Sequence, residues 1–175
     1  MAFTKETAIE ILVSGDIKGF NEKRPYDENN LLDFSELDFT EVDLAGANLS
    51  LADLNGANFT EMELENVDFS GSDLTSASFI RANIIECDFS GANLNGANFA
   101  SANCYANFAD ADLSGADFSD GDFAESDFTL SINMSMCKFD KYTTWPDASD
   151  LPDDFDSTYV PDSDDEDDAP VGDYY

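Results

Sequence analysis

Residues 47–79 read ANLSL-ADLNG-ANFTE-MELEN-VDFSG-SDLTS-ASF, and every block of five has a large apolar residue at its third place. Followed in both directions, the pattern gives 22 units whose central residues run from Phe34 to Phe139. The place two before the centre is mostly small, and the place directly before it is Asp or Asn in 19 of the 22 units. A period of five fits neither the helical period of about 3.6 nor the strand period of about 2. The pattern therefore predicts a chain that turns a corner in every unit.

A second order of twenty residues appears when the centres are sorted by every fourth unit. One column is phenylalanine throughout: Phe39, Phe59, Phe79, Phe99, Phe118 and Phe139. The opposite column holds Leu49, Phe69, Phe89, Phe108 and Phe128, and the other two columns hold mostly Leu, Ile and Met. This order persists through two irregular steps: four residues after Cys104 and six residues after Phe128. The residue missing from the first step is compensated by the extra residue in the second. This order predicts a four-sided, all-β solenoid with twenty residues per turn. The central residue of each unit should point into the core, and each irregular step should distort one corner.

Units such as Ala47-Asn48-Leu49-Ser50-Leu51 and Ala57-Asn58-Phe59-Thr60-Glu61 resemble the pentapeptide-repeat family. The resemblance covers about residues 32–140 and implies a right-handed quadrilateral β-helix. Residues 17–24, and Thr143-Thr144-Trp145-Pro146 with Phe155-Asp156, are similar to the flanking segments of cyanobacterial-type members. We expect an N-terminal helical cap over 1–31, the β-helix over 32–141, a C-terminal cap over 142–159 and an acidic disordered tail over 160–175.

Both ends of a solenoid need covers, because open ends expose unpaired backbone groups and apolar rings. Residues 4–14 predict a helix capped by Thr4 and stopped by Gly15, and Asp16 can start a second helix that Pro25 ends. At the far end, we expect Tyr142, Trp145, Leu151 and Phe155 to cover Phe139.

Composition narrows the class of protein. The 175 residues contain 39 acids, 7 bases and no histidine, a formal net charge of -32. Such a charge repels nucleic acids and anionic membranes and favours basic protein surfaces. The sequence contains neither a membrane-length apolar run nor a secretory signal pattern, and its three cysteines show no paired spacing, so a cytoplasmic protein is expected.

Catalysis and cofactor binding are not expected. Repeat side chains fill the predicted interior, and the acidic pairs lie on a convex wall rather than in a cavity. Cys87 and Cys137 fall at small inward places and Cys104 at a large one, so all three are interpreted as buried structural residues. Calcium bound along the acidic rows is an alternative, although no EF-hand spacing or glycine-rich nonapeptide repeat is present.

The candidate site is the acidic outer surface. Asp33, Asp53 and Asp73 fall one turn apart, Asp68 and Asp88 form a shorter row, and four further residues girdle one turn. Asp and Asn side chains bind nearby backbone at turns, which explains the residue type but not the preference for a charged one. Two carboxylates about 5 Å apart repel by roughly 0.8 kcal/mol even in water. We therefore expect a protein partner with a basic surface to bind here; the full candidate set is Asp33, Asp53, Asp68, Asp73, Asp88, Asp112, Asp117, Asp120, Asp122 and Asp127.

A DNA mimic is the main alternative to a general interaction or scaffold module. From Phe34 to Phe139 the chain has 19 acids against Arg81 and Lys138, a net charge of -17. Over roughly 26 Å of stacked turns this is about 0.65 charges per Å, against about 0.6 for duplex DNA. The resemblance also implies a partner such as DNA gyrase or another topoisomerase, because the family includes gyrase-binding members.

Two further expectations concern single residues and assembly. Arg81 is expected to pair with Glu61. The sequence leaves the oligomeric state open, with a monomer favoured.

Overall fold

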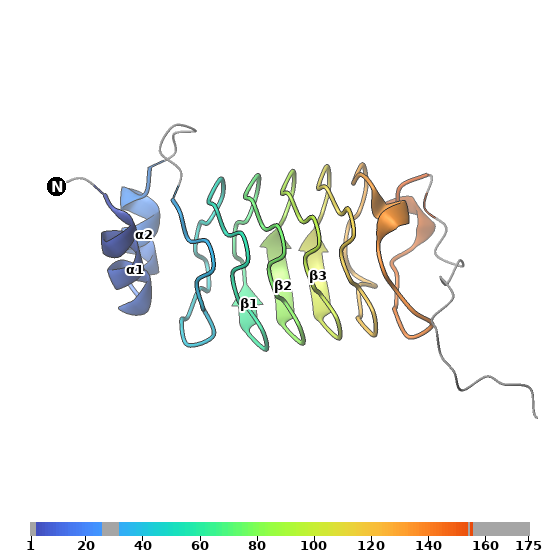
Figure 1. Cartoon of the computed structure of the whole chain (residues 1–175), viewed down its shortest axis with the longest axis horizontal. Coiled ribbons are helices and arrows are strands. Elements are labelled where there is room, and N and C mark those ends of the chain that lie inside the picture. Colours follow the sequence, from blue (N-terminus) through green and yellow to red (C-terminus); the bar gives the residue numbers. More distant parts are fainter. Residues whose placement is uncertain (1–2, 26–31, 154, 156–175) are drawn as a thin grey trace, which may run out of the picture.

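A computed structural model describes residues 3–25, 32–153 and 155. The chain forms a rod of stacked turns with two helices across its N-terminal end (Figure 1). The elements are α1 (Lys5–Val13), α2 (Ile17–Lys23), β1 (Glu63–Glu65), β2 (Asn83–Asp88), β3 (Asn103–Asn107) and two 3-10 helices, Met134–Met136 and Ala148–Asp150. The expected disordered tail lies outside the described residues, as does part of the expected C-terminal cap.

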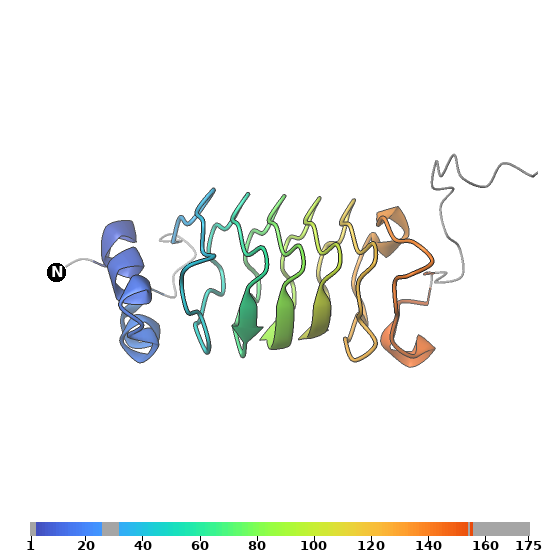
Figure 2. The ribbon, with the colours of Figure 1, turned by 90° about the horizontal axis from the view of Figure 1, so that it is seen from below.

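The turns stack through parallel bridges twenty residues apart. Strands β1, β2 and β3 form a parallel sheet along one wall (Figure 2), with Leu64, Ile84 and Cys104 in register. On the other walls each turn contributes single bridges, and one such series runs Asp33, Asp53, Asp73, Asn93 and Asp112. The predicted twenty-residue turn is thus confirmed, including the shorter spacing of nineteen after the four-residue step.

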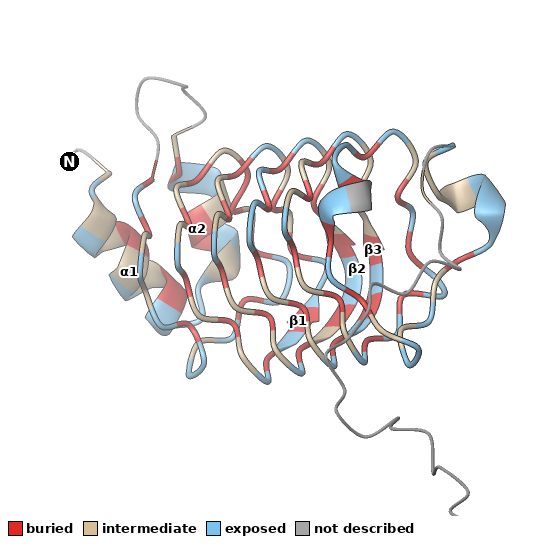
Figure 3. Ribbon diagram, turned by 45° about the vertical axis from the view of Figure 1, so that its right-hand side comes forward, coloured by how far each residue is buried: buried red, intermediate tan, exposed pale blue. Residues whose placement is uncertain are grey.

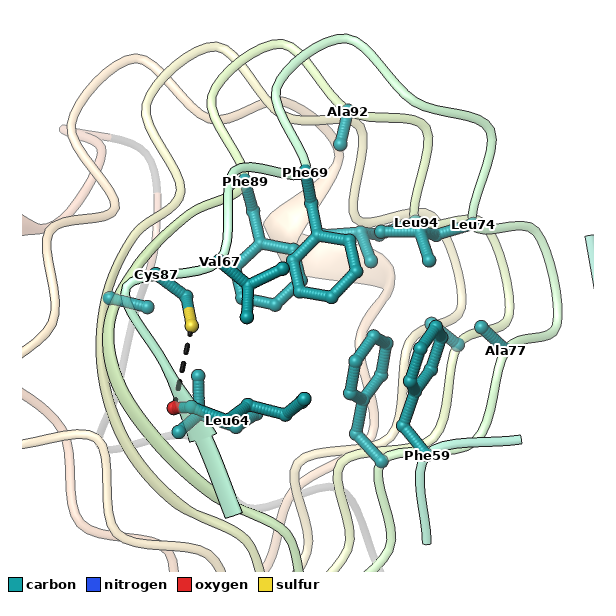
Figure 4. Packing of buried hydrophobic residues seen from close by; sticks show 14 of the residues in the cluster. Phe59, Leu64, Val67, Phe69, Leu74, Ala77, Cys87, Phe89, Ala92 and Leu94 are labelled. Carbon is teal, nitrogen blue, oxygen red and sulfur yellow. Dashed lines mark hydrogen bonds between the residues drawn. The ribbon is translucent and has the colours of Figure 1, made fainter. Parts of the chain in front are cut away.

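Phenylalanine rings fill the interior in two facing stacks. In the Phe39 column, successive rings from Phe39 to Phe99 are nearly parallel, with centroids 4.7 to 5.0 Å apart. Phe69 and Phe89 of the opposite column stack at 4.9 Å (Figure 4). Each ring also meets rings of the facing stack edge-on, as Phe69 meets Phe79 at 5.9 Å. These centroid distances match the spacing of about 4.8 Å between hydrogen-bonded strands. Each ring therefore stacks directly on the ring of the preceding turn.

The two irregular steps distort the coil where the sequence predicts. Opposite the four-residue step, Ile85 pairs with Tyr105 and Cys87 with Ala106, so Glu86 bulges out of register. At the six-residue step, Asn133 is the extra residue, with a φ of 60°, and it leads into the 3-10 helix Met134–Met136. Buried and exposed residues alternate around the remaining turns (Figure 3).

The corner position, two residues after a centre, adopts left-handed backbone in most units. Gly71 has a φ of 62° there, and a Cβ at this place would come within 2.9 Å of Leu51 in the preceding turn. The same conformation occurs at corners occupied by other residues, such as Glu86 (φ 54°) and Arg81 (φ 55°). Left-handed backbone costs a non-glycine residue roughly 1–2 kcal/mol. The stacked ladders on both sides must therefore hold these corners in place.

The N-terminal helices form as predicted. Thr4 Oγ1 accepts the Thr7 amide at the start of α1, and Asp16 caps α2 through the Gly19 amide. Phe20 is fully buried and lies 6.5 Å from Phe34, so α2 covers the first ring of the coil.

Arg24 is a buried anchor between α2 and the first turn that the sequence pattern did not predict. It is 4% exposed, and its guanidinium donates to the carbonyl oxygens of Asn48 (2.7 Å) and Ser50 (2.5 Å). Asn21 donates to the Gly46 carbonyl oxygen and accepts the Asn48 amide. Side chains of α2 and of its C-cap residue thus bond backbone groups at the end of the coil.

Substituting Arg24→Met is expected to lower the free energy of unfolding by about 1–3 kcal/mol, because buried carbonyl groups lose their donors. Urea denaturation followed by circular dichroism measures this change. Lys23→Met removes the same charge from an exposed neighbour and serves as the control. Equal stability of the two variants would show that the Arg24 bonds contribute nothing.

At the far end, Trp145 continues the coil beyond the last regular unit. Thr144 bridges to Asp122, which seats Trp145 over Phe123 with ring centroids 5.9 Å apart. Trp145 also contacts Phe139 at 5.5 Å, and Phe155 contacts both rings. The prediction that Tyr142 shares this cover is wrong: its side chain points to solvent and the residue is 64% exposed.

Candidate functional site

The acidic rows are built from a repeated turn. In most units, the Oδ1 atom of the Asp or Asn before the centre accepts the backbone amide two residues later. The Thr75 amide reaches Asp73 in this way at 3.0 Å, and the Ser90 amide reaches Asp88 at 2.9 Å. Nine of the ten candidate residues make this bond: Asp33, Asp53, Asp68, Asp73, Asp88, Asp112, Asp117, Asp122 and Asp127. The sequence-based explanation of the residue type is therefore confirmed.

Asparagine makes the same turn and adds a bond between turns of the coil. The Thr60 amide binds Asn58 Oδ1 at 3.1 Å, as it would bind an aspartate. The amide nitrogen is then free to donate along the column: Asn48 donates to Asp68 at 2.9 Å, and Asn107 to Asp88 at 3.1 Å. An Asp that has an Asn next to it in the same column thus accepts a hydrogen bond from the neighbouring turn. An Asp whose neighbour in the column is another Asp lacks this donor.

The predicted rows lie as expected. Bridges join Asp33 to Asp53 and Asp53 to Asp73 on one wall, and Asp68 to Asp88 on another. Lys5 of α1 forms an ion pair with Asp33 at 3.3 Å, which partly neutralises the N-terminal end of the longer row.

The predicted girdle is also present, with one exception among the candidates. Asp112, Asp117, Asp122 and Asp127 precede the centres of four successive units and occupy four successive walls of one turn. Asp120 instead sits at a corner, where its carboxylate accepts the Ser101 hydroxyl at 2.9 Å. The expected pair of Arg81 and Glu61 is confirmed at 2.6 Å.

Hydrogen bonds keep several of these carboxylates ionised. The Ser35 hydroxyl and amide lower the pKa of Asp33, and the Thr40 amide and hydroxyl lower that of Asp38. Burial acts to raise the pKa of Asp112, but bonds from Asn133 and Ser114 outweigh it and the net shift is downward. Because these pKa values are lower in the folded chain, the three groups favour folding at neutral pH. That contribution is lost as the pH falls through their lowered folded-state pKa values.

All three cysteines are buried, as the sequence indicates. Burial raises the pKa of Cys87 to about 11 and that of Cys137 to about 12, and it raises the pKa of Cys104 still further. Cys87 Sγ donates to the Leu64 carbonyl oxygen at 3.5 Å (Figure 4). The thiols therefore remain protonated at neutral pH and serve as core side chains.

Native-state labelling tests this interpretation. At pH 8 we expect an aromatic disulfide reagent to react with the folded chain at least about a hundredfold more slowly than with the urea-unfolded chain. The unfolded chain supplies the reference rate for three accessible thiols. Fast labelling of even one thiol in the folded protein would contradict the burial.

Within the described residues, no three His, Cys, Asp or Glu side chains come together as a metal site, so the calcium alternative gains no support there. None of the helices described is both long and apolar enough to cross a membrane.

The sequence model of the family described as pentapeptide repeats matches eight copies in this chain, over residues 33–71, 72–103, 92–132 and 106–141. The chain belongs to the pentapeptide-repeat family. No curated protein sequence matches it.

Solved pentapeptide-repeat structures are similar to this chain. HetL of the cyanobacterium Nostoc sp. strain PCC 7120, a protein involved in heterocyst differentiation regulation, is 23% identical, with a TM-score of 0.39. That match covers 65% of this chain and 59% of HetL, so the chain spans less than two thirds of that relative. A protein of the Arabidopsis thaliana thylakoid lumen is 27% identical over 67% of this chain and 73% of its own, with a TM-score of 0.30. The plasmid-mediated fluoroquinolone resistance protein QnrB1 is 20% identical over 68% and 76%, with a TM-score of 0.34.

Proposed function

We propose that this pentapeptide-repeat protein is a non-catalytic interaction module whose acidic outer surface binds a basic surface of a protein partner. The observation that carries the proposal is the charge of the coil. From Phe34 to Phe139 the net charge is -17, and carboxylates project from all four walls. Of the two basic residues in this stretch, Arg81 is already paired with Glu61.

The turn geometry leaves part of each aspartate free for a partner. In the Asp53, Asp73 and Asp88 turns, Oδ1 alone accepts the hydrogen bonds found among the described residues. The second oxygen of each carboxylate is available to a lysine or arginine from outside. Charge-assisted bonds of this kind are about twice as strong as neutral ones.

The same geometry allows charge to be removed without disturbing the coil. Because Asn makes the same turn bond, the combined substitution Asp53→Asn, Asp73→Asn, Asp88→Asn and Asp127→Asn should fold normally. Its melting temperature is expected to equal or exceed that of the natural chain, since carboxylate pairs that repel by roughly 0.8 kcal/mol are removed. In quantitative pull-downs from a host lysate, we expect the partners of the natural chain to be lost, and to dissociate as salt rises.

Glutamate at the same four positions is the reciprocal control. It keeps the charge, but its longer side chain does not reproduce the short Asp turn, so stability should fall while partner binding persists. Partners that survive in the Asn variant, or that resist salt, would exclude surface charge as the recognition element.

DNA mimicry by the same surface is the second candidate, favoured by the line charge of about 0.65 per Å beside about 0.6 for duplex DNA. A supercoiling assay with DNA gyrase and titrated protein tests it. Inhibition that duplex DNA relieves by competition would support mimicry. Uninhibited supercoiling together with unchanged duplex binding would reject it and leave the interaction module as the proposal.

A further inference from the structure

A missing corner residue leaves a hollow in the side of the coil. Glu86 occupies the corner after Ile85, but the next turn passes directly from Tyr105 to Ala106. The turn that contains β3 therefore lacks a corner residue at this place, whereas the turns before and after it have one (Glu86 and Glu125). The resulting hollow has a volume of about 360 Å³ and is lined by Tyr105 together with Glu86, Asp88, Glu125 and Asp127.

The hollow opens beside an apolar pair on the strand wall. Ile85 of β2 and Tyr105 of β3 are register partners, and they are 40% and 50% exposed. The outward places on either side of this pair along the wall are Glu65 in β1 and the small Ala124. An exposed aliphatic residue next to an exposed ring, at the mouth of a hollow, gives a partner side chain apolar surface to cover.

Charge at the hollow is negative and uncompensated by neighbouring bases. Asp88 and Asp127 each accept a turn amide, from Ser90 and Thr129 respectively. Glu86 and Glu125 are exposed and form no ion pair with any described residue.

We infer that the hollow and the Ile85–Tyr105 pair receive an arginine side chain from a basic segment of the partner protein. This inference rests on the proposed function and names the place where recognition is most specific. A guanidinium is planar, stacks on an aromatic face and donates in several directions, so it can lie against Tyr105 while binding Glu86 and Glu125. A lysine ammonium is a compact, strongly hydrated charge and uses the ring less well. The volume lies at the lower end of the range for ligand pockets, about 300–1,000 Å³, and suits one side chain.

Fluorescence anisotropy with labelled hexa-arginine and hexa-lysine peptides tests the inference on the full chain at physiological ionic strength. We expect hexa-arginine to bind more tightly, and Tyr105→Ala to weaken its binding by about three- to tenfold through loss of the stacked ring. Inserting one glycine between Tyr105 and Ala106 restores the five-residue step and fills the corner while every carboxylate remains. This insertion should remove the preference for arginine. Tyr142→Ala, at an exposed tyrosine outside the hollow, should leave binding unchanged.

A matched pair of charge variants separates this inference from the proposed function. Glu86→Gln with Glu125→Gln should weaken hexa-arginine binding more than Glu36→Gln with Glu41→Gln, which removes the same charge from two other exposed corners. Equal losses in the two pairs, equal affinity for the two peptides, or an unaffected Tyr105→Ala variant would overturn the inference and leave general acidic binding intact. Failure of both peptides to bind the natural chain would count against both.

Discussion

Deletion of the five residues 92–96 is expected to unfold the protein, whereas deletion of the twenty residues 72–91 is expected to leave it folded. The shorter deletion moves every later unit by one wall. Phe99 would then lie over Leu74 and Phe108 over Ile84, while Phe79 and Phe89 would each lose the ring that stacks on them from the following turn. Overpacked rings cost about 1–3 kcal/mol each, and voids cost more. The combined loss, on the order of 5 kcal/mol or more, is comparable to the whole stability of many domains, about 5–15 kcal/mol.

The longer deletion is the control, because it removes one entire turn. Leu94 then lies over Leu54, and Phe99 over Phe59, so each column continues with the same kind of side chain. Nearest-neighbour contacts of one turn are lost and all others remain. Circular dichroism, urea denaturation and gel filtration of the two variants measure the difference. A stable, compact chain after the five-residue deletion would show that column order does not hold the core together.

Phe99→Ala is expected to reduce the free energy of unfolding by about 3–5 kcal/mol, the largest effect of any single substitution considered for this chain. The Phe99 ring stacks on Phe79 at 4.7 Å and on Phe118 at 5.4 Å, and it meets Phe89 and Phe108 edge-on. Its removal leaves a void between two turns that the hydrogen-bonded ladders keep from closing. Urea denaturation of the variant and the natural chain measures the loss.

Tyr142→Ala is the control for this substitution, since the tyrosine side chain is mostly exposed and its removal should change stability by no more than about 0.5 kcal/mol. Phe99→Leu keeps part of the volume and should fall between the two. A Phe99→Ala variant as stable as the control would mean that neither the packing nor the stacking of this ring stabilises the fold.

Most of the coil is predictable from the sequence because one rule repeats in every unit. The column of Phe39, the row from Asp33 to Asp73 and the distorted corner after Cys104 all follow from counting residues. The Asx turn is predictable for the same reason, since the residue type and its place recur together.

The features that the sequence did not predict depend on contacts that occur once. Arg24 bonds backbone carbonyl groups, which leave no mark in the residue pattern. The sequence predicted that Trp145 covers Phe139, but not that it lies in the column of Phe123. Trp145 follows Phe139 by six residues rather than five, and the bridge from Thr144 to Asp122 fixes its column. The distorted corner was predicted, but the hollow beside the exposed Tyr105 was not. The hollow is recognised only when the residues of three adjacent turns are seen together in the structure.

The paired arrangement of the columns has a consequence for how such a chain can change length. Aromatic rings fill most places in two opposite columns and aliphatic side chains fill most places in the two between them, so the core has an approximate twofold axis along the rod. A shift of ten residues places an aromatic column over an aromatic column, whereas a shift of five places it over an aliphatic one. Tandem duplication of a ten-residue segment would therefore lengthen the rod by half a turn and rotate all later residues by half a revolution about its axis. The core would be unchanged, while any recognition surface carried on the rotated part would face a new direction.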